Sequence, residues 1–242
     1  MKIALLGYGK MGKEIEAIAL QRGHSIVLKV GSSNAYTFTN EELKQADVAI
    51  EFSNPQWAPA NNIRCFNSEI PVVSGTTGWN EKLNDVKHIA KLLNQSFLYA
   101  SNFSLGVNVF FELNKKLASL LKNYPEYGIS MQEIHHTQKL DSPSGTAISL
   151  AKDILHYRSD LDKWVNEKTA NKNELGIESL RMEGVPGTHS ICYESGIDSI
   201  EIKHTAHNRK GFALGAVVAA EWIIGKKGVF EMKDVLGLNE TA

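Results

Sequence analysis

The stretch KIALLGYGKMG, residues 2–12, decides the fold class. It begins as an apolar run typical of a buried strand and then places Gly7, Gly9 and Gly12 in the spacing GxGxxG. Apolar side chains recur at helical spacing after this turn, and Gly23 predicts the end of the helix. A glycine-rich turn between a strand and a helix is the context in which this motif binds a dinucleotide. The sequence therefore predicts a nucleotide-binding βαβ unit at its start.

Each glycine of this turn has its own expected steric role. Gly7 permits the tight turn, Gly9 lets the backbone approach a pyrophosphate, and Gly12 lets the helix pack against the strand. The helix N-terminus adds N–H donors and positive potential. A glycine turn without a ligand is the alternative, but the strand and the helix on either side favour nucleotide binding.

The end of the second expected strand bears on the choice of nucleotide. Residues 28–33, LKVGSS, contain neither Asp nor Glu, the residues that normally bind the ribose 2′-hydroxyl of NAD. Their absence removes repulsion against a 2′-phosphate. Candidate contacts for that phosphate are Lys29, Lys10, Ser32 and Ser33. The alternative is that Lys29 is only solvated and that the protein binds the nucleotide equally well with or without the 2′-phosphate. We predict the use of both NADPH and NADH, with NADPH preferred.

Short apolar runs alternate with helical patterns through the first part of the chain, as in the βαβ units of a parallel sheet. The expected strands are Lys2–Leu6, Ser25–Val30, Asp47–Phe52, Pro71–Ser74 and Ser96–Ala100. The expected helices are Gly12–Arg22 and Glu81–Asn94. These elements predict an α/β domain.

Beyond Asn102 the pattern changes to that of a second, α+β domain. An amphipathic helix is expected over Leu105–Leu121, and the polar stretch Asn166–Gly176 is expected to be an exposed connection. The strands of an open mixed sheet are expected at Ile129–His135, Glu178–Glu183, His189–Glu194 and Ser199–Thr205. Phe212–Ile224 predicts a helix so apolar that it requires two covering surfaces, which its return to the first domain would supply.

The composition is that of an ordinary globular protein. The 242 residues include 26 Lys and Arg and 27 Asp and Glu, which gives a net charge of −1 and excludes the usual basic footprint of nucleic-acid or anionic-membrane binding. No run approaches the roughly 18 apolar residues of a membrane span, and glycines interrupt the first apolar run too early for a signal peptide. Cys65 and Cys192 show neither metal nor redox spacing. We expect a cytoplasmic protein whose cysteines only pack.

Residues with reactive or charged side chains are most concentrated in the segment EIHHTQKLDSPSGTA, residues 133–147. It leaves an expected strand, runs through a polar loop and enters a helix. Ser142 or Ser144 would cap this helix, and Ser144, Gly145 and Thr146 would then offer hydroxyl and backbone N–H groups to a carboxylate.

Upstream of that helix start, Lys139 adds a positive charge, and His135 and His136 are of a type that titrates near neutrality. If the strand persists, the two histidines point to opposite sides. A lone histidine is more often structural, but the grouping favours a functional site. No metal site is expected, because adjacent histidines do not easily share an ion and neither HExxH nor CxxC is present. The sequence also lacks the GxSxG turn of a serine hydrolase.

These residues resemble one family closely, the 4-hydroxy-tetrahydrodipicolinate (dihydrodipicolinate) reductases of the diaminopimelate and lysine pathway. The resemblance spans nearly the whole chain, and its most specific string is EIHHTQKLDSPSGTA. The other matching strings are GYGKMG at 7–12, EFSNP at 51–55, SGTTGW at 74–79, ASNFSLGVNV at 100–109, HTAHNRKGFALGAV at 204–217 and FEMKDVLGL at 230–238.

The resemblance implies an NAD(P)H-dependent enzyme in two domains. Residues 1–104 and 212–242 would form a Rossmann-like dinucleotide-binding domain completed by the C-terminal helix. Residues 105–211 would form a substrate-binding and tetramerisation domain, and the chain would be a homotetramer. The implied substrate is a small cyclic imine with two carboxylates, which is reduced with loss of water to tetrahydrodipicolinate.

The resemblance also implies roles for individual residues. His135 would be the acid/base and Lys139 the proton donor, while His136, Ser144, Gly145 and Thr146 would hold the substrate carboxylates. The cofactor would lie along Gly7, Tyr8, Gly9, Lys10, Met11, Gly12, Gly75, Thr76, Thr77, Ala100, Ser101, Asn102 and Phe103. No metal is implied. Arg181 and Arg209 are further candidates to line the substrate site with positive charge. The sequence does not decide whether they do.

The sequence shows two departures from the family's pattern and leaves three alternative functions open. Residues 31–40 lack the family's usual acid, and the chain is short for the family, which predicts a trimmed loop. A semialdehyde dehydrogenase would show a nucleophilic cysteine beside a motif, and neither cysteine has one. A non-catalytic NAD(P)H-sensing module would bind the cofactor without turnover, as would a family member that keeps the fold and has lost activity.

Overall fold

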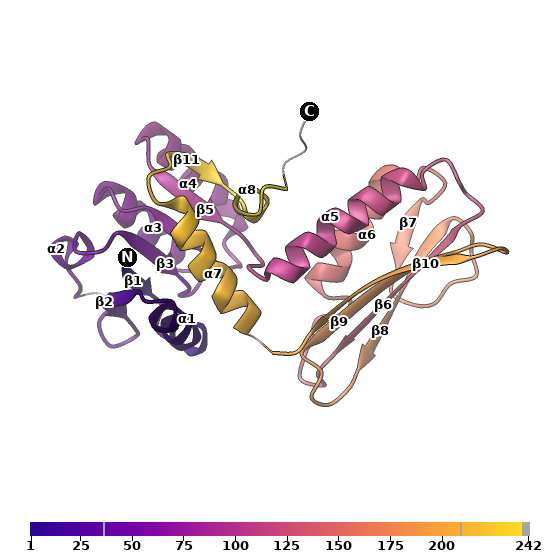
Figure 1. Ribbon diagram of the computed structural model, residues 1–242, viewed down its shortest axis with the longest axis horizontal. Coiled ribbons are helices and arrows are strands. Elements are labelled where there is room, and N and C mark those ends of the chain that lie inside the picture. The colour runs from indigo at the N-terminus through magenta and orange to yellow at the C-terminus, as the bar shows by residue number, and fades with distance from the viewer. Residues whose placement is uncertain (36, 209, 239–242) are drawn as a thin grey trace. The chain divides into compact units, whose positions relative to one another are not determined.

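The structure, a computed structural model, describes residues 1–35, 37–208 and 210–238 (Figure 1). The chain divides into two compact units: the first ends after Asn108 and resumes at Lys210, and the second fills the interval. Each unit has its own sheet and its own hydrophobic core. Arg209, one of the two cationic candidates from the sequence, lies outside the described residues.

The first unit is built on a sheet with the strand order β11-β5-β4-β3-β1-β2, in which every neighbouring pair is parallel. Its strands are β1 Lys2–Leu6, β2 Ser25–Val30, β3 Val48–Glu51, β4 Val72–Ser74, β5 Ser96–Tyr99 and β11 Gly228–Phe230. The predicted parallel sheet and its five expected strands are confirmed. The sequence missed β11 because only two adjacent apolar residues, Val229 and Phe230, mark it, whereas the equally short β4 lies in the longer apolar run IPVVS.

Helices cover both faces of this sheet. They are α1 Lys10–Gln21, α2 Asn40–Leu43, α3 Ala58–Asn67, α4 Asn80–Leu92, α7 Lys210–Ile223 and α8 Met232–Val235. Ile3 and Leu5 of β1 pack in a cluster with α1 and α7, which lie side by side (Figure 1). Ala4 and Leu6 point the other way, into a cluster with α3 and α4. The prediction that the C-terminal helix returns to complete the first domain is therefore confirmed.

Helix α7 approaches the segment after β5 very closely at Gly215. A Cβ atom built at this glycine would lie 1.7 Å from the carbonyl oxygen of Phe103. Both sides of the contact are backbone, so neither can yield as the end of a side chain would. The contact fixes the position of Phe103, a residue expected to line the cofactor site.

This close approach predicts that Gly215→Ala destabilises the protein by about 2–3 kcal/mol, as overpacking of a core does. Gly211→Ala is the matched control on the same helix, because its Cβ would meet only the Ser104 hydroxyl at 3.7 Å. We expect the control to stay within about 1 kcal/mol of the wild type. Urea unfolding of the three proteins measures both effects, and equal unfolding midpoints for the two variants would contradict the steric account.

The second unit is an open mixed sheet with the order β10-β9-β6-β8-β7. Its strands are β6 Gly128–His135, β7 Lys163–Val165, β8 Glu174–Arg181, β9 Gly187–Glu194 and β10 Ser199–Ala206. The pairs β6–β8 and β7–β8 are parallel, whereas β6–β9 and β9–β10 are antiparallel. The predicted mixed sheet is confirmed.

The expected connection over Asn166–Gly176 is partly wrong. Strand β8 begins at Glu174, and Leu175 and Gly176 are buried within it. The preceding residues are almost all polar, which hid the start of the strand from a hydrophobic pattern. Strand β7, with three residues, was missed for the same reason as β11.

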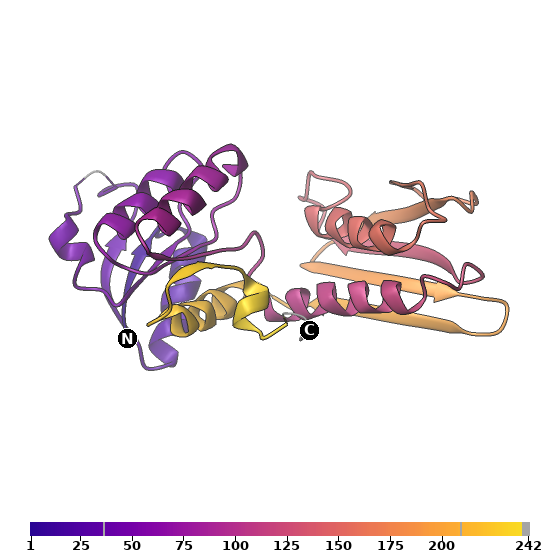
Figure 2. The same ribbon diagram turned by 90° about the horizontal axis from the view of Figure 1, so that it is seen from above.

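One face of the mixed sheet is covered by α5 Leu105–Leu120 and α6 Gly145–Tyr157. Figures 1 and 2 agree that both helices lie on the same side of the strands. The core residues Met131 of β6, Ile177 of β8 and Ile191 of β9 all point to this side. Alternation along each strand therefore divides the sheet into a face under the helices and a face without them.

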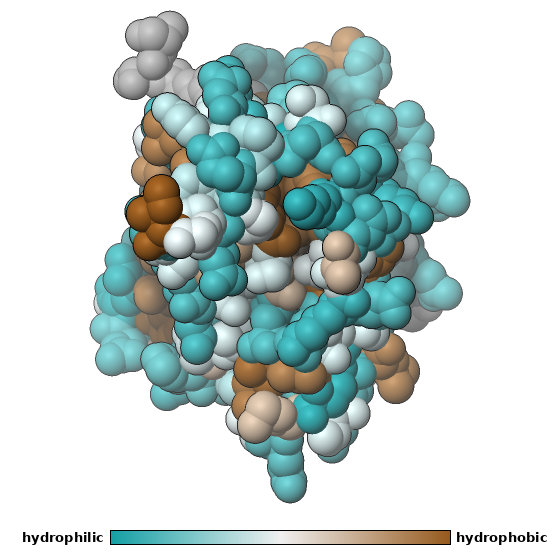
Figure 3. Space-filling model, turned by 90° about the vertical axis from the view of Figure 1, so that its right-hand side faces the viewer, coloured by the Kyte–Doolittle hydropathy of each residue, from teal (hydrophilic) through white to brown (hydrophobic). Residues whose placement is uncertain are grey.

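The surface shown in Figure 3 is mainly hydrophilic, with apolar residues in separate patches. Within the described residues, none of the helices combines the length and the apolarity that crossing a membrane requires.

Candidate functional site

The glycine turn after β1 is built as its sequence suggested. Gly7 has φ +110°, and a Cβ there would lie 2.0 Å from the carbonyl oxygen of Phe52. A Cβ at Gly12 would lie 2.2 Å from the Gly7 carbonyl oxygen, whereas at Gly9 it would meet no atom within 4 Å. Gly7 and Gly12 are thus required by packing within the chain. Gly9 instead borders open space, which leaves room for a ligand at the backbone.

Helix α1 begins at this open space. Its N-cap is Gly9, which provides no side-chain cap, and the amide of Lys13 donates to the Gly9 carbonyl. The amides before Lys13 have no partner within the helix. A cavity of about 430 Å³ lies at Gly9 and is also lined by Ser32, Ser53 and Asn54. Amide donors at a helix N-terminus beside a cavity form a suitable seat for phosphate groups.

Three of the segments expected to bind the cofactor meet at Phe52. Its carbonyl oxygen faces Gly7, and its ring occupies the space beside Gly75, where a Cβ would lie 2.2 Å from the ring. The same ring contacts that of Phe103, with 5.4 Å between the ring centroids. The structure therefore brings the glycine turn, the loop after β4 and the segment after β5 to one place.

A buried carboxylate, Glu51, holds the ends of β3 and β4 together. It accepts hydrogen bonds from the Ser53 amide at 3.1 Å, the Ser74 hydroxyl at 2.7 Å and the Thr76 hydroxyl at 2.9 Å. Burial raises the pKa of Glu51, and these donors oppose that shift. Glu51 was not among the site residues predicted from the sequence. An acid that closes an otherwise apolar strand, VAIE, was the available signal.

Lys29, at the end of β2, was expected to be free to contact a 2′-phosphate, but it is paired with an acid. Its ammonium lies 2.5 Å from Glu16 of α1 and 5.1 Å from the centre of the Tyr8 ring. The Tyr8 hydroxyl donates to the other oxygen of Glu16, and this hydrogen bond raises the pKa of Tyr8. Although β2 ends without an acid, helix α1 thus supplies one beside it, and Lys29 is already paired. Ser32 is the 2′-phosphate candidate that lines the cavity.

The remaining residues expected near the cofactor lie around these elements. Thr76 is buried and accepts a hydrogen bond from the Trp79 indole at its carbonyl oxygen, 2.6 Å away. Asn102 accepts from the Ser104 amide at 2.9 Å. Lys10, Thr77 and Ser101 are exposed, and Met11 and Ala100 are half-buried.

In the second unit, Glu133 anchors the start of α6. The Ser144 amide donates to both oxygens of the Glu133 carboxylate, at 3.0 and 3.1 Å. The Ser144 hydroxyl accepts from the Ala147 amide at 3.1 Å and is the N-cap of the helix. Gly145 is exposed and Thr146 is half-buried in the first helical turn. These residues therefore present hydroxyl and amide groups at a helix N-terminus, where an anion is stabilised.

Three cationic or potentially cationic side chains surround Glu133, which is fully buried. Nδ1 of His135 and Nε2 of His189 each lie 3.6 Å from Oε2, and Arg181 lies 3.5 Å from Oε1. Burial alone would raise the pKa of Glu133, but hydrogen bonds from His189 and Ser144 outweigh it and lower the pKa to about 2. The carboxylate is therefore ionised at neutral pH.

His135 is buried on the helix-covered face of β6, with 7% of its surface exposed. Burial lowers the pKa of this imidazole to about 4, while nearby Glu133 acts in the opposite direction. This is below the near-neutral value expected for the residue type. Its Nδ1 atom has no hydrogen-bond partner among the described residues. At neutral pH the ring is uncharged and able to accept a proton.

Arg181 holds the loop between β6 and α6. Its guanidinium donates to the carbonyl oxygen of Asp141 at 2.6 Å and to that of Lys139 at 3.4 Å. The Lys139 ammonium is paired with the Asp141 carboxylate at 2.8 Å. His136 follows the last residue of β6, and its buried Nδ1 has no partner within the described part of the chain. The structure thus gathers His135, Ser144 and Arg181 around Glu133, and places Lys139 in the adjoining loop.

Ligand atoms of Glu133, His135 and His189 lie within 4.8 Å of one another, a spacing that a metal ion could bridge. The Arg181 guanidinium and the Ser144 amide already contact the same carboxylate. A divalent ion would meet the repulsion of that guanidinium in a buried setting. We therefore describe this cluster by its hydrogen bonds and ion pairs.

The fold and the glycine turn define a Rossmann-like α/β protein with a second, mixed-sheet unit. The family "Dihydrodipicolinate reductase, N-terminus" matches residues 1–103, and "Dihydrodipicolinate reductase, C-terminus" matches residues 106–236. The chain belongs to the dihydrodipicolinate reductase family, as the resemblance in its sequence implied. The predicted class of enzyme, an oxidoreductase of this family, is confirmed with it.

Relatives agree with this assignment, and a solved structure has a similar fold. The chain is 53% identical to the 4-hydroxy-tetrahydrodipicolinate reductase of Christiangramia forsetii, with 98% of each chain covered. It is 31% identical to that of Neisseria meningitidis, over 93% of this chain and 84% of the relative. The dipicolinate-bound dihydrodipicolinate reductase of Paenisporosarcina has the same fold, with a TM-score of 0.72, 24% identity, and coverage of 96% of this chain and 97% of that one.

The low pKa of His135 predicts part of the acid sensitivity of the protein. The unfolded chain takes up a proton on this residue near pH 6.5 and the folded chain only near pH 4, so stability is lost as the pH falls through this interval. Each tenfold difference in proton affinity is about 1.4 kcal/mol, which gives a loss of about 3 kcal/mol.

We expect His135→Gln to lack this loss. Urea unfolding of wild type and variant at pH 7 and pH 4 measures it. If the free energy of unfolding falls equally in both proteins, His135 is not held neutral by its surroundings.

Proposed function

We propose that this chain reduces 4-hydroxy-tetrahydrodipicolinate to tetrahydrodipicolinate with NAD(P)H and a proton, releasing water and NAD(P)⁺, in diaminopimelate and lysine biosynthesis. The observation that carries the proposal is the 53% identical reductase, which matches this chain over both units. As a biosynthetic enzyme of this kind, it would act in the cytoplasm.

The first unit would be the dinucleotide-binding domain, which the sequence predicted as residues 1–104 with 212–242 and which in the structure ends after Asn108 and resumes at Lys210. The space at Gly9 and the first-turn amides of α1 fit a pyrophosphate, and the cavity beside them continues to Ser32. The predicted cofactor residues on the Gly75 and Phe103 segments meet the same turn through Phe52. When bound, the reduced nicotinamide supplies the hydride of the reaction.

The second unit, predicted as residues 105–211, would bind the substrate. Ser144, Gly145 and Thr146 offer hydroxyl and amide donors to a substrate carboxylate, and His136 would hold the other. A dianion beside His135 favours the charged imidazolium and so raises the proton affinity of a ring that is otherwise neutral. His135 would therefore act as acid/base, and Lys139 would donate the proton once the substrate separates it from Asp141.

We expect Lys139→Ala to lower kcat by about tenfold or more, because the variant lacks the proton donor. His135→Gln is expected to lower kcat by more than it raises KM, as loss of an interaction made in the transition state does. Lys163→Ala, an exposed lysine of the same unit, serves as the control. Steady-state oxidation of NADPH measures all three. If kcat of either site variant equals that of the wild type, the substituted residue takes no part in catalysis.

For the cofactor, we propose the use of both NADPH and NADH, with NADPH preferred. Lys29 neutralises Glu16 at the end of β2, so an acid lies there without presenting net negative charge to a 2′-phosphate. Ser32, on the wall of the cavity, would contact that phosphate.

In Lys29→Ala the Glu16 carboxylate loses its partner and repels the 2′-phosphate. We expect KM for NADPH to rise about fivefold or more, with a smaller change for NADH. Lys13→Ala, at an exposed lysine on α1, the helix that carries Glu16, is the matched control. Equal changes of KM for the two cofactors in Lys29→Ala would show that this ion pair does not influence the choice between them.

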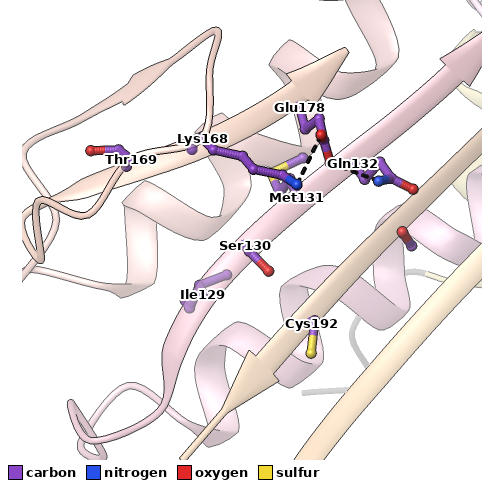
Figure 4. Close-up of a pocket in the computed structure, with 10 residues that line it drawn as sticks. Ile129, Ser130, Met131, Gln132, Lys168, Thr169, Glu178 and Cys192 are labelled. Carbon is purple, nitrogen blue, oxygen red and sulfur yellow. Dashed lines mark hydrogen bonds and ion pairs between the residues drawn. The ribbon is translucent and has the colours of Figure 1, made fainter. Parts of the chain in front are cut away.

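We further propose a homotetramer assembled through the face of the mixed sheet that α5 and α6 leave uncovered. Figure 4 shows this face, where Gln132 donates to Glu178 at 2.7 Å and Lys168 pairs with Glu178 at 3.0 Å. Ser130 and Cys192 lie beside them and line a shallow cavity of about 440 Å³. Light scattering coupled to size-exclusion chromatography is expected to give a mass four times the chain mass of 26.8 kDa. A monomer mass at working concentration would contradict this proposal.

The assay that tests the proposed function follows the oxidation of NADPH and NADH with substrate generated freshly from pyruvate and aspartate semialdehyde. We expect oxidation that depends on both the enzyme and the substrate. Binding of the reduced cofactor without its oxidation would instead indicate a sensing module.

A further inference from the structure

His189 is a buried histidine that neither the family resemblance nor the sequence motifs singled out. It lies on β9 directly across from Glu133 of β6, in register, and 6% of its surface is exposed. It shares the helix-covered face with Ile191 and Tyr193, which are core residues. A polar side chain in a row of inward-facing apolar residues requires a polar partner.

Three partners surround the His189 ring. Its Nε2 atom lies 3.2 Å from the Ser144 hydroxyl oxygen and 3.6 Å from Oε2 of Glu133. The ring also meets that of His135 edge to face, with 5.0 Å between the centroids. His189 therefore contacts the anchor, the helix cap and the imidazole of the proposed active site.

The charge on Glu133 decides where the proton of His189 lies. An ionised carboxylate accepts hydrogen bonds and cannot donate one. With Glu133 ionised, the atom of His189 that faces it is stabilised as N–H. Nε2 therefore carries a proton, and the hydroxyl oxygen of Ser144, the closer of its two neighbours, is the acceptor available to it.

The proton on Nε2 of His189 determines whether the Ser144 hydroxyl can donate its own proton to a ligand. A serine hydroxyl has one proton to donate and two lone pairs that accept. Its oxygen already accepts from the Ala147 amide, and the Nε2–H of His189 would be the second donor. The hydroxyl proton then stays free. If Nε2 were bare, Ser144 would donate its proton to His189 and could offer none to a ligand.

We propose that His189 is a positioning residue of the active site, whose Nε2–H, oriented by the Glu133 carboxylate, holds the Ser144 oxygen as an acceptor and leaves the Ser144 proton for a substrate carboxylate. The inference rests on the proposed function, since it assigns a role within the same site. It makes His189 a determinant of affinity for dicarboxylate ligands and leaves the cofactor site of the first unit unaffected.

The test uses two substitutions of His189 and a matched control. His189→Leu removes the N–H, and His189→Gln retains an amide N–H of similar reach. His204→Gln replaces the cross-strand neighbour of His189 on β10, whose ring packs against Phe110 instead. The readouts are KM and kcat for the substrate, KM for NADPH, and Kd for dipicolinate, the ligand of the Paenisporosarcina structure, by calorimetry.

We expect His189→Leu to raise KM for the substrate and Kd for dipicolinate about tenfold, as loss of one hydrogen bond to a charged group does. Its kcat is expected to change less than threefold and its KM for NADPH not at all. His189→Gln should recover most of the affinity, and His204→Gln should behave as wild type. An unchanged Kd in His189→Leu, or a failure of His189→Gln to recover affinity, would overturn the proposal.

A double-mutant cycle with Ser144→Ala separates positioning from general loss of structure. If His189 acts through the Ser144 hydroxyl, His189→Leu has little further effect on Kd once that hydroxyl is absent. The same fold-change with and without the hydroxyl would contradict this. Should His189→Leu not fold, ¹⁵N NMR of the wild-type imidazoles still decides, because the proposal requires the proton on Nε2 and a bare Nε2 overturns it. A wild-type protein that neither oxidises NADPH with substrate nor binds dipicolinate would instead refute the proposed function.

Discussion

The ionised carboxylate of Glu133 is the contact on which the second unit's candidate site depends. It is fully buried, yet the Ser144 amide, Arg181, His135 and His189 all lie within 3.6 Å of its oxygens. A buried charge is tolerated only with such partners. Through them, one side chain fixes the start of α6 and the environment of the imidazole that would exchange protons. The loop that carries Lys139 is tied to the same carboxylate through Arg181.

Each unit contains a buried glutamate that binds a loop, and the pKa values of the two carboxyls shift in opposite directions. Glu51 and Glu133 are both buried on strands and both bind the residues of a following loop. Glu51 is surrounded by neutral hydroxyl and amide donors, so burial dominates and raises its pKa. Glu133 has histidine and arginine neighbours, and its pKa falls. A neutral setting suits loops that would receive the negative cofactor, and a cationic setting suits a site for a dicarboxylate.

Much of this arrangement could be predicted from the sequence, because strand and helix periods and the glycine turn are local signals. The strands β7 and β11 each contain only two adjacent apolar residues, which is too weak a signal to mark a strand. The contacts of Glu133 with Arg181 and His189 join residues far apart along the chain, and only the sheet register brings them together. A sequence signal for His189 did exist: it occupies an inward-facing position of the alternating segment that includes Ile191 and Tyr193.

The ionisation of Glu133 is tested most directly by titration of its side-chain carboxyl carbon, followed by ¹³C NMR. We expect a carboxylate that stays ionised from neutral pH down to about 4, with a pKa of about 2. A resonance that titrates at or above the ordinary glutamate value of 4.5 would contradict it. In that case Ser144, His135 and His189 would face a neutral acid, and the proton assignments of the site would have to change.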